Sequence, residues 1–171
     1  MPTFPELPRS AEPELLDAPT HDLAALADNL REIRQIKRDW PDRAVAVSLM
    51  VPCEESAWKT ILPMVEDTGA DGIELNFGCP HGMSERGMGA AVGQVPEYVE
   101  MVTRWCKQHS RLPVIVKLTP NVTDILQPAR AAKRGGADAV SLVNTISAIM
   151  AVDLDRMTPS PHVDGQGAHG G

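Results

Sequence analysis

The sequence predicts an α/β fold in which about four parallel strands alternate with helices. Four short apolar runs, several of them rich in β-branched residues, are each preceded by a segment with apolar residues at helical spacing. Such nearly continuous apolar runs are typical of parallel strands that are buried on both faces. Helix–strand alternation builds a parallel sheet from βαβ units, either as a doubly wound open sheet or as part of a (β/α)8 barrel. Periodicity alone does not separate these two architectures.

The start of the chain differs from the rest in composition. Five prolines fall within the first twenty residues, and each fixes φ and removes a backbone donor. We therefore expect residues 1–21 to form an irregular segment and residues 22–171 to form the folded domain. Asp22 is a candidate N-cap for a helix that continues past Ile36 and ends at Pro41. The first strand is expected at Ala44–Val51.

The second and third units repeat the same order. A helical pattern around residues 58–65 leads into a strand at Gly72–Asn76. Pro96 opens the next helix, whose apolar face includes Cys106, and a strand at Leu112–Leu118 follows.

The fourth unit has recognisable helix ends. Thr123 is the expected N-cap of a helix that stops at Gly135 and Gly136. The last strand is expected at Ala139–Asn144. No periodic pattern follows Asn144, so the C-terminal tail is expected to be loop-like.

Composition and charge exclude several classes of function. The formal net charge of -7 disfavours binding to nucleic acid or to an anionic membrane surface. No apolar run approaches the ~20 residues of a spanning helix, and the N-terminus does not have the pattern of a signal peptide. Three cysteines do not make a disulfide framework, so a cytoplasmic location is expected. No metal or iron–sulfur motif is expected, because the histidines lack partners at ligand spacing: His21, His81, His109, His162 and His169.

Polar residues that could carry chemistry stand at the ends of the predicted strands. The second strand ends at Asn76 and is followed by Cys79, Lys117 lies near the end of the third, and the fourth ends at Asn144 and is followed by Thr145. Because ligands bind beyond the carboxyl ends of parallel strands, these side chains should converge on one pocket. Asparagine amides match the N–H and C=O groups of a planar imide, lysine balances developing negative charge, and cysteine exchanges protons.

Each of these residues also has a purely structural interpretation. Cys79 could be a small buried apolar residue, and Lys117 could extend to solvent along its aliphatic stem. The two asparagines could be turn residues, and His81 an ordinary loop histidine. The glycine-rich stretch Gly82–Gln94 could be a mobile active-site loop or a plain connector. Recurrence at equivalent strand ends favours the functional interpretation.

Three motifs carry a resemblance to a known family. They are ADGIELNFGCPHGMSERGMG (Ala70–Gly89), VIVKLTPNVTDI (Val114–Ile125) and RGGADAVSLVNTISAI (Arg134–Ile149). Together they resemble the FMN-dependent domain of dihydropyrimidine dehydrogenases, in particular the bacterial NAD-dependent catalytic subunit. The Asn-x-x-Cys-Pro element is also similar to that of dihydroorotate dehydrogenases. The resemblance covers roughly Leu23–Gly171.

The resemblance implies a fold and a reaction. It implies a partial (β/α)8 TIM barrel that binds FMN and reduces the 5,6 double bond of uracil or thymine, or runs the reverse reaction, in pyrimidine catabolism. Cys79 corresponds to the catalytic residue that gives a proton to C5, while reduced FMN gives hydride to C6. Asn76, Asn144 and Thr145 correspond to pyrimidine-binding residues. Lys117 corresponds to a flavin contact, and His81 to a supporting histidine beside the catalytic loop.

The resemblance also implies partners, and the sequence departs from the family in places. The family suggests a partner subunit that binds FAD and NADH, and an oligomeric enzyme. The sequence departs from the family immediately before Cys79, where Gly78 stands in place of the serine of many relatives. The barrel's last two strands, which hold the FMN phosphate, are not found, and neither is an iron–sulfur segment, so the isolated chain is expected to bind FMN poorly. Two alternatives stay open: a dihydroorotate dehydrogenase, and a non-catalytic fragment without a complete flavin site.

Overall fold

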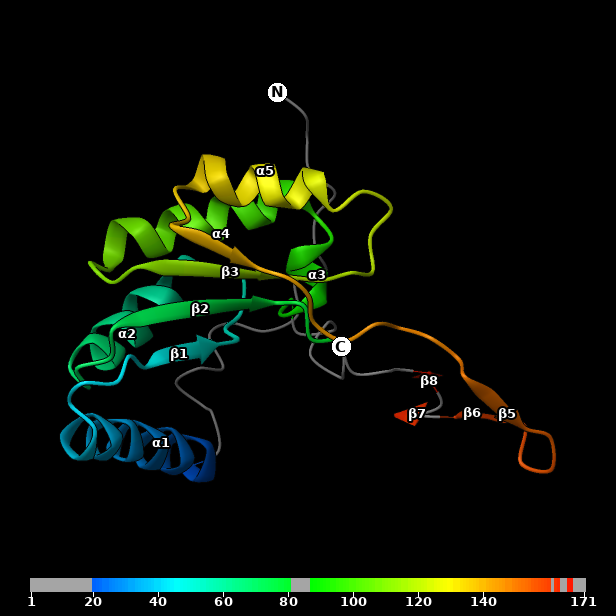
Figure 1. The fold of residues 1–171 in the computed structure, drawn as a ribbon, viewed down its shortest axis with the longest axis horizontal. Helices are drawn as coiled ribbons and strands as arrows, with labels where there is room; N and C mark the ends of the chain where they lie inside the picture. Colours follow the sequence, from blue (N-terminus) through cyan, green and yellow to red (C-terminus); the bar gives the residue numbers. More distant parts are fainter. Residues whose placement is uncertain (1–19, 81–86, 161, 164–165, 168–171) are drawn as a thin grey trace.

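A four-stranded parallel sheet forms the centre of the molecule (Figure 1). The computed structural model describes residues 20–80, 87–160, 162–163 and 166–167. The sheet has the order β1-β2-β3-β4, so strands that are neighbours in sequence are neighbours in space. The strands are β1 (Ala46–Leu49), β2 (Gly72–Phe77), β3 (Val114–Leu118) and β4 (Ala139–Ser141).

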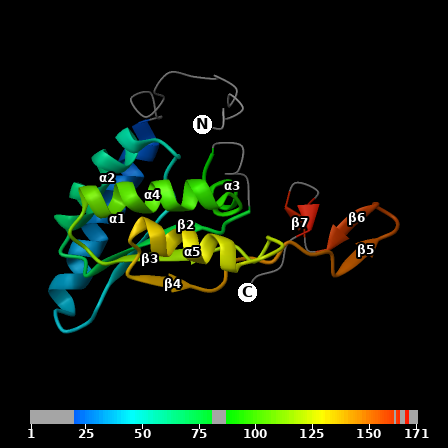
Figure 2. The ribbon, with the colours of Figure 1, turned by 90° about the horizontal axis from the view of Figure 1, so that it is seen from above.

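A helix precedes each strand, as the sequence predicts. The helices are α1 (Thr20–Asp39), α2 (Glu55–Glu66), α3 (Ala90–Gly93), α4 (Pro96–His109) and α5 (Leu126–Gly135). Figures 1 and 2 show α2, α4 and α5 on the same face of the sheet. Within the described residues the sheet does not close on itself, and β1 and β4 are its edges. The predicted α/β class, a partial (β/α)8 barrel of four parallel strands, is confirmed.

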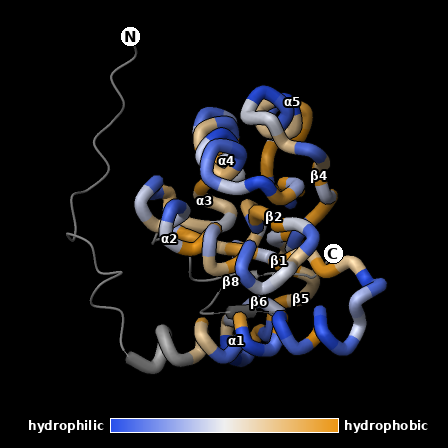
Figure 3. Tube along the Cα trace, turned by 90° about the vertical axis from the view of Figure 1, so that its left-hand side faces the viewer, coloured by the Kyte–Doolittle hydropathy of each residue, from blue (hydrophilic) through white to orange (hydrophobic). Residues whose placement is uncertain are grey.

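The helix-covered face of the sheet forms the core. Alternate strand residues point to opposite faces, and the register aligns one apolar set under the helices. Large side chains from α2 and α4 complete this layer, and in Figure 3 the outer sides of α4 and α5 are hydrophilic while β2 is hydrophobic. The fully or almost fully buried residues of the strands and of these two helices include Ile73, Leu75, Phe77, Val114, Val116, Leu118, Trp58, Leu62, Val65, Val99, Val102 and Cys106.

The opposite face of the sheet is polar and open. It carries Ser48 of β1, Glu74 and Asn76 of β2, and Ile115 and Lys117 of β3, all of them half-buried or exposed. Burial of the strands on both faces was therefore a wrong prediction, as β1 shows by alternating exposed and buried residues and β4 by having no buried residue. The physical reason is that the helices cover a single face.

The amino edge of the sheet is tied by an aspartate just before β2. After Gly69, whose φ is 80°, the Asp71 carboxylate accepts hydrogen bonds from the Val45 peptide N–H at 2.8 Å and from Lys37 at 2.7 Å. The Asp71 peptide N–H donates in turn to the Val45 carbonyl at 2.9 Å. Asp71 therefore joins the end of α1 to the starts of β1 and β2.

The same arrangement recurs before β4. Gly136, with φ 95°, ends α5, and Asp138 follows two residues later. Its carboxylate accepts from the Val114 peptide N–H at 2.7 Å and from Lys107 at 2.8 Å, while its own N–H donates to the Val114 carbonyl at 2.9 Å. The motif Gly-Ala-Asp thus builds two equivalent joints between a helix and two strands.

Helix starts were predicted less well than helix interiors. Because α1 begins at Thr20, Asp22 lies inside the helix and is not its N-cap. Thr123 is not the cap of α5 either, because that helix begins at Leu126, whose N–H donates to the Asp124 carboxylate at 2.9 Å. The predicted ends of these two helices, before Pro41 and at Gly136, are confirmed.

Two segments predicted as loops contain regular structure. Residues 90–93 of the glycine-rich stretch form α3. In the tail, β5 (Ala151–Asp153) pairs antiparallel with β6 (Thr158–Ser160), and β7 (His162–Val163) pairs with β8 (Gln166–Gly167). Figure 1 shows the β5–β6 hairpin extending away from the sheet.

Some predictions concern residues that the structure does not describe. Most of the proline-rich segment 1–21, His81 and the first part of the glycine-rich stretch lie outside the described residues. Among the helices that are described, none is both long and apolar enough to cross a membrane.

Candidate functional site

The carboxyl ends of β2 and β4 bring two asparagines into direct contact. Asn144 Nδ2 donates a hydrogen bond to Asn76 Oδ1 at 2.8 Å, although the two residues are 68 positions apart. Asn76 Oδ1 also accepts from the Gly78 peptide N–H at 3.2 Å. The sequence-predicted meeting of polar side chains at this edge therefore occurs for these two residues.

Peptide donors fix the orientation of both amide groups. Asn144 Oδ1 accepts from the Thr145 peptide N–H at 2.7 Å and from the Thr145 hydroxyl at 3.1 Å. Because a peptide N–H only donates, the atoms that face it on Asn76 and Asn144 must be the carbonyl oxygens. Within the described part of the chain, Asn76 Nδ2 has no hydrogen-bond partner, so it can donate to a ligand carbonyl.

The segment after β4 is held against the segment after β3. Asn121 Nδ2 donates to the Thr145 carbonyl at 2.9 Å, and Asn121 Oδ1 accepts from the Ser147 peptide N–H at 2.8 Å. Asn121 itself follows Thr119, which is fully buried and accepts from the Asn121 N–H at 3.2 Å. Asn121 therefore positions Thr145 beside the asparagine pair.

Close packing of glycines shapes the path of the chain around Cys79. A Cβ on Gly78 would lie 2.3 Å from Asn144 Cβ, so only glycine lets Asn144 approach this closely. Cys79 is partly buried, and its carbonyl accepts from the Ala90 peptide N–H at 3.0 Å. A Cβ on Gly89 would lie 2.5 Å from that carbonyl. The backbone of Cys79 is thus anchored to the start of α3. Cys79 directly follows Gly78, which contacts both asparagines.

Lys117 lies beside Asn76 on the open face. The two residues are register partners on β3 and β2. The Lys117 ammonium lies 3.6 Å from the Glu74 carboxylate, which accepts a hydrogen bond from the Ser48 hydroxyl at 2.9 Å. The Lys117 and Glu74 side chains are 30% and 19% exposed, so neither is fully solvated.

Glu74 was missed by the sequence reasoning. The available signal was a carboxylate in the middle of the apolar run GIELN, where a strand buried on both faces would leave it unpaired. It lies on the open face between β1 and β3, close to the amide pair.

The other two thiols are held in apolar surroundings. Burial, with a smaller contribution from the charge of Glu54, raises the pKa of the Cys53 thiol to about 11. Cys106 is fully buried in the core, and desolvation raises its pKa further still. These surroundings fit a structural role for Cys53 and for Cys106 and leave Cys79 as the thiol at the strand-end cluster.

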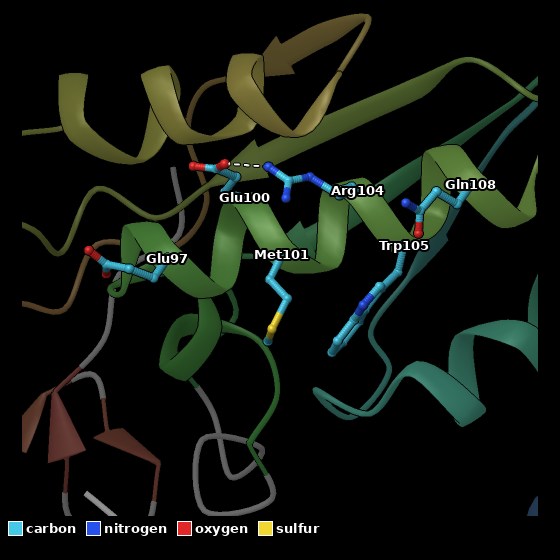
Figure 4. A pocket seen from close by; sticks show the side chains of 6 residues that line it. All are labelled: Glu97, Glu100, Met101, Arg104, Trp105 and Gln108. Carbon is cyan, nitrogen blue, oxygen red and sulfur yellow. Dashed lines mark hydrogen bonds and ion pairs between the residues drawn. The ribbon is translucent and has the colours of Figure 1, made fainter. Parts of the chain in front are cut away.

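One other feature of the described part of the chain is a weaker candidate than this cluster. A surface hollow of about 420 Å³ is lined by α4 alone, as Figure 4 shows, and holds the exposed Glu100–Arg104 ion pair. The described residues contain no group of three or more His, Cys, Asp or Glu placed to hold a metal ion. His81 lies outside the described residues, so its place relative to the cluster stays a prediction.

Comparison with known proteins finds relatives that are named as dihydropyrimidine or dihydroorotate dehydrogenases. The chain is 41% identical over 142 residues to the chloroplastic dihydropyrimidine dehydrogenase (NADP(+)) of Arabidopsis thaliana, covering 83% of this chain and 33% of that protein. It is 41% identical over 146 residues to the NAD-dependent dihydropyrimidine dehydrogenase subunit PreA of Escherichia coli, covering 85% and 35%. The catalytic subunit of dihydroorotate dehydrogenase B (NAD(+)) from Caldicellulosiruptor saccharolyticus is 51% identical over 89 residues, covering 52% and 28%.

These matches cover much of this chain but only part of each relative. The chain spans about a third of the length of the two dihydropyrimidine dehydrogenases. Among solved structures, the carboxyl transferase domain of Rhizobium etli pyruvate carboxylase has a TM-score of 0.43 at 15% identity, over 58% of this chain and 16% of that one. The profile of the family described as dihydroorotate dehydrogenase matches residues 19–171. Since that match includes most of the 171 residues, the chain belongs to the dihydroorotate dehydrogenase family.

Proposed function

We propose that this chain forms part of an FMN-dependent oxidoreductase that acts on the CH–CH group of pyrimidine bases, a dihydropyrimidine dehydrogenase of the NAD-dependent type. It would reduce the 5,6 double bond of uracil or thymine, or catalyse the reverse reaction. The observation that carries this proposal is the hydrogen-bonded Asn76–Asn144–Thr145 cluster at the carboxyl edge of the sheet, with Lys117 beside it. The identity to two proteins named dihydropyrimidine dehydrogenase supports it.

The amide cluster suits a flat ring with alternating donors and acceptors. Asn76 Nδ2 can donate to a ring carbonyl, and the second Nδ2 hydrogen of Asn144 can do the same. Because peptide N–H groups fix both amides, their donors are oriented before the ring binds, which lowers the entropic cost of binding. Asn76, Asn144 and Thr145 are therefore proposed to bind the pyrimidine.

Cys79 is proposed as the proton donor. Addition of hydride at C6 of the ring leaves negative charge at C5 and the adjacent carbonyl, and that carbon must take up a proton. The Cys79 thiol would form the new C–H bond at C5 by giving up its S–H proton, and the resulting thiolate would be reprotonated from solvent. Cys53 and Cys106 are unsuited to this role, because burial raises the pKa of each thiol and Cys106 lies in the core.

The open face of the sheet fits a flavin ring. Its half-exposed surface offers an ammonium at Lys117, which suits the carbonyl and nitrogen edge of an isoalloxazine. FMN, when bound, would supply the hydride. Lys117 is proposed to contact that edge of the flavin and to balance the negative charge of its reduced form.

The remaining parts of the enzyme are proposed from the family. One relative is named as a subunit and another as a catalytic subunit, which supports a partner subunit. We propose that this partner delivers electrons from NADH through FAD. We propose that residues 22–171 supply part of the FMN site, so that the isolated chain binds FMN weakly. The complete enzyme is proposed to be oligomeric and cytoplasmic. His81 is proposed to support the loop that follows Cys79.

The proposal is tested by measuring flavin binding and uracil reduction. FMN fluorescence should be quenched on titration with the chain, and Asn76→Ala should lower uracil binding to the FMN-loaded protein by at least about tenfold. Cys79→Ser should retain flavin and lose most of the turnover, because a hydroxyl is a far weaker acid. Wild-type turnover in Cys79→Ser would contradict the proposed proton donor, and absence of any FMN binding would contradict the proposed function.

A dihydroorotate dehydrogenase is the second candidate, supported by 51% identity over 89 residues to a catalytic subunit of that name. Orotate carries a carboxylate and needs an additional cation. The Lys117 ammonium is already paired with Glu74, which favours an uncharged pyrimidine. Comparison of uracil with orotate as substrates of the FMN-loaded protein decides between the two.

A further inference from the structure

We propose that Glu74 is a positioning residue that holds the Lys117 ammonium in place for the flavin. This inference rests on the proposed function, because it assigns to Lys117 a flavin to contact. It adds a residue that the sequence motifs did not single out, and it connects all three strands β1, β2 and β3 through one carboxylate.

The register places Glu74 where it can act on Lys117. Asn76 pairs with Lys117 across β2 and β3, and Glu74 lies two residues before Asn76 on the same face. The Glu74 carboxylate therefore lies diagonally below the lysine, 3.6 Å from its ammonium. A long lysine side chain at this position has many rotamers, and the carboxylate favours those that lean across β2 beside Asn76.

Ser48 fixes the carboxylate in turn. It is the register partner of Glu74 on β1 and donates a hydrogen bond to Glu74 Oε1 at 2.9 Å. The same oxygen faces Lys117, so Ser48 and Lys117 approach it from opposite neighbouring strands. The chain Ser48–Glu74–Lys117 thus crosses the open face of the sheet and ends at the ammonium.

Partial burial gives this pair more influence than a surface ion pair. Both side chains are less than a third exposed and lie on the sheet face rather than on a helix surface. Charges in such surroundings interact through a lower effective dielectric than in water. Without Glu74, the Lys117 ammonium would move toward solvent. The Lys117 side chain would then lose more rotamer freedom when it contacts the flavin, which would weaken flavin binding.

The first test examines the lysine itself, without flavin. The chain is treated with an N-hydroxysuccinimide ester, and acylation of each lysine is followed by mass spectrometry. In Glu74→Gln, labelling of Lys117 should rise roughly two- to fivefold, since loss of the ion pair releases the amine. Ser48→Ala should give a smaller increase. Glu100→Gln, which removes an α4 carboxylate that binds Arg104 on α4 and Arg134 on α5, should leave Lys117 labelling unchanged.

The second test separates positioning from a merely structural ion pair. FMN affinity is measured by fluorescence titration for wild type, Glu74→Gln, Lys117→Met and the double variant. Glu74→Gln should weaken FMN binding roughly fivefold, and should have no further effect when Lys117 is already methionine. Glu74→Asp should recover part of the affinity.

The outcomes distinguish this inference from the proposed function. Unchanged Lys117 labelling in Glu74→Gln, or additive effects of the two substitutions on FMN affinity, would overturn the positioning role while leaving a flavin site intact. If wild type binds no FMN and Lys117 labelling still rises in Glu74→Gln, the ion pair between Glu74 and Lys117 exists. In that case both the flavin role of Lys117 and the proposed function are wrong.

Discussion

At Gly78, the absence of a side chain decides how the two asparagines meet. A Cβ there would lie 2.3 Å from Asn144 Cβ and 2.9 Å from Asn144 Nδ2, so Gly78→Ala must push Asn144 away from Asn76. We expect the substitution to break the 2.8 Å hydrogen bond between the amides and to raise the KM for the pyrimidine about tenfold in the FMN-loaded protein. Steady-state kinetics with uracil would measure this change.

Gly72→Ala is the matched control for Gly78→Ala. Gly72 is the first residue of β2, the strand that ends just before Gly78, but a Cβ there would meet nothing nearer than the Pro113 carbonyl at 3.4 Å, an ordinary contact. Its KM should stay near that of wild type. Equal KM values for the two variants would mean that the asparagine contact does not govern substrate binding.

The three thiols should differ in their reaction with alkylating reagents. The thiolate is the reactive form, and burial raises the pKa of Cys53 to about 11 and that of Cys106 further. In the folded chain at pH 7.5, iodoacetamide should therefore modify Cys79 while Cys53 and Cys106 stay largely unmodified. Peptide mass spectrometry after timed quenching gives the three rates, and a denatured sample provides the control in which all three react.

Residues of the candidate site were predictable where a polar side chain stands at or just beyond the end of an apolar run. Asn76 and Asn144 met that criterion, and the structure brings them into contact. Glu74 did not, because it lies within the strand and a glutamate there looks like an isolated exception until the register to Ser48 and Lys117 is known. Contacts across strands depend on register and on which face the helices cover, and neither is encoded locally.

At the scale of elements, the two aspartates of the amino edge should govern acid stability. The hydrogen bond from Lys107, with that from the Val114 N–H, lowers the pKa of Asp138 below its ordinary value of 3.8. A lowered pKa means that this carboxylate stabilises the fold above the ordinary value, and that the stabilisation is lost as pH falls through the folded-state pKa. We expect Asp138→Asn to lower the Tm by roughly 2–4 °C at pH 7.

The pH dependence separates this effect from a general loss of packing. Since wild type itself loses the Asp138 contribution in acid, the difference in Tm between wild type and Asp138→Asn should shrink below about pH 4. Thermal unfolding followed by circular dichroism across pH 3 to 7 would test this. Asp42→Asn, an exposed turn residue, should not change the Tm. A difference that is constant with pH would contradict the assigned role.

Elements with strong periodicity were predictable and weakly patterned ones were not. The predicted start of α4 at Pro96 and its predicted buried face are confirmed, because an apolar repeat of 3.6 residues indicates a helix with one buried face. The β5–β6 hairpin has short strands of three residues with exposed or half-buried side chains, so the sequence has no alternating apolar pattern that would predict them. The starts of α1 and α5 were misplaced because a suitable cap residue does not by itself fix the first helical turn.

Viewed as a whole, the two edges of the sheet have different roles. The amino edge holds the Asp71 and Asp138 joints, each of which ties a helix to two strands. The carboxyl edge holds the asparagine cluster and leads into Cys79. This division is the one expected of (β/α) architecture, where the amino face stabilises and the carboxyl face carries the site.

The open sheet should make the isolated chain associate with itself. β4 is an edge strand, and Val140, Leu142 and Ile146, on and just after it, are 44%, 59% and 42% exposed. An exposed edge with apolar side chains favours pairing with another copy, so sedimentation velocity should show species larger than the monomer at tens of micromolar. Leu142→Lys should weaken this association about tenfold by placing charge at the edge.

Leu126→Lys is the matched control, because Leu126 is 55% exposed but begins α5, and this variant should associate as wild type does. Equal association of the two variants would locate the contact away from β4, and a monomeric wild type would show that the exposed edge is tolerated in water.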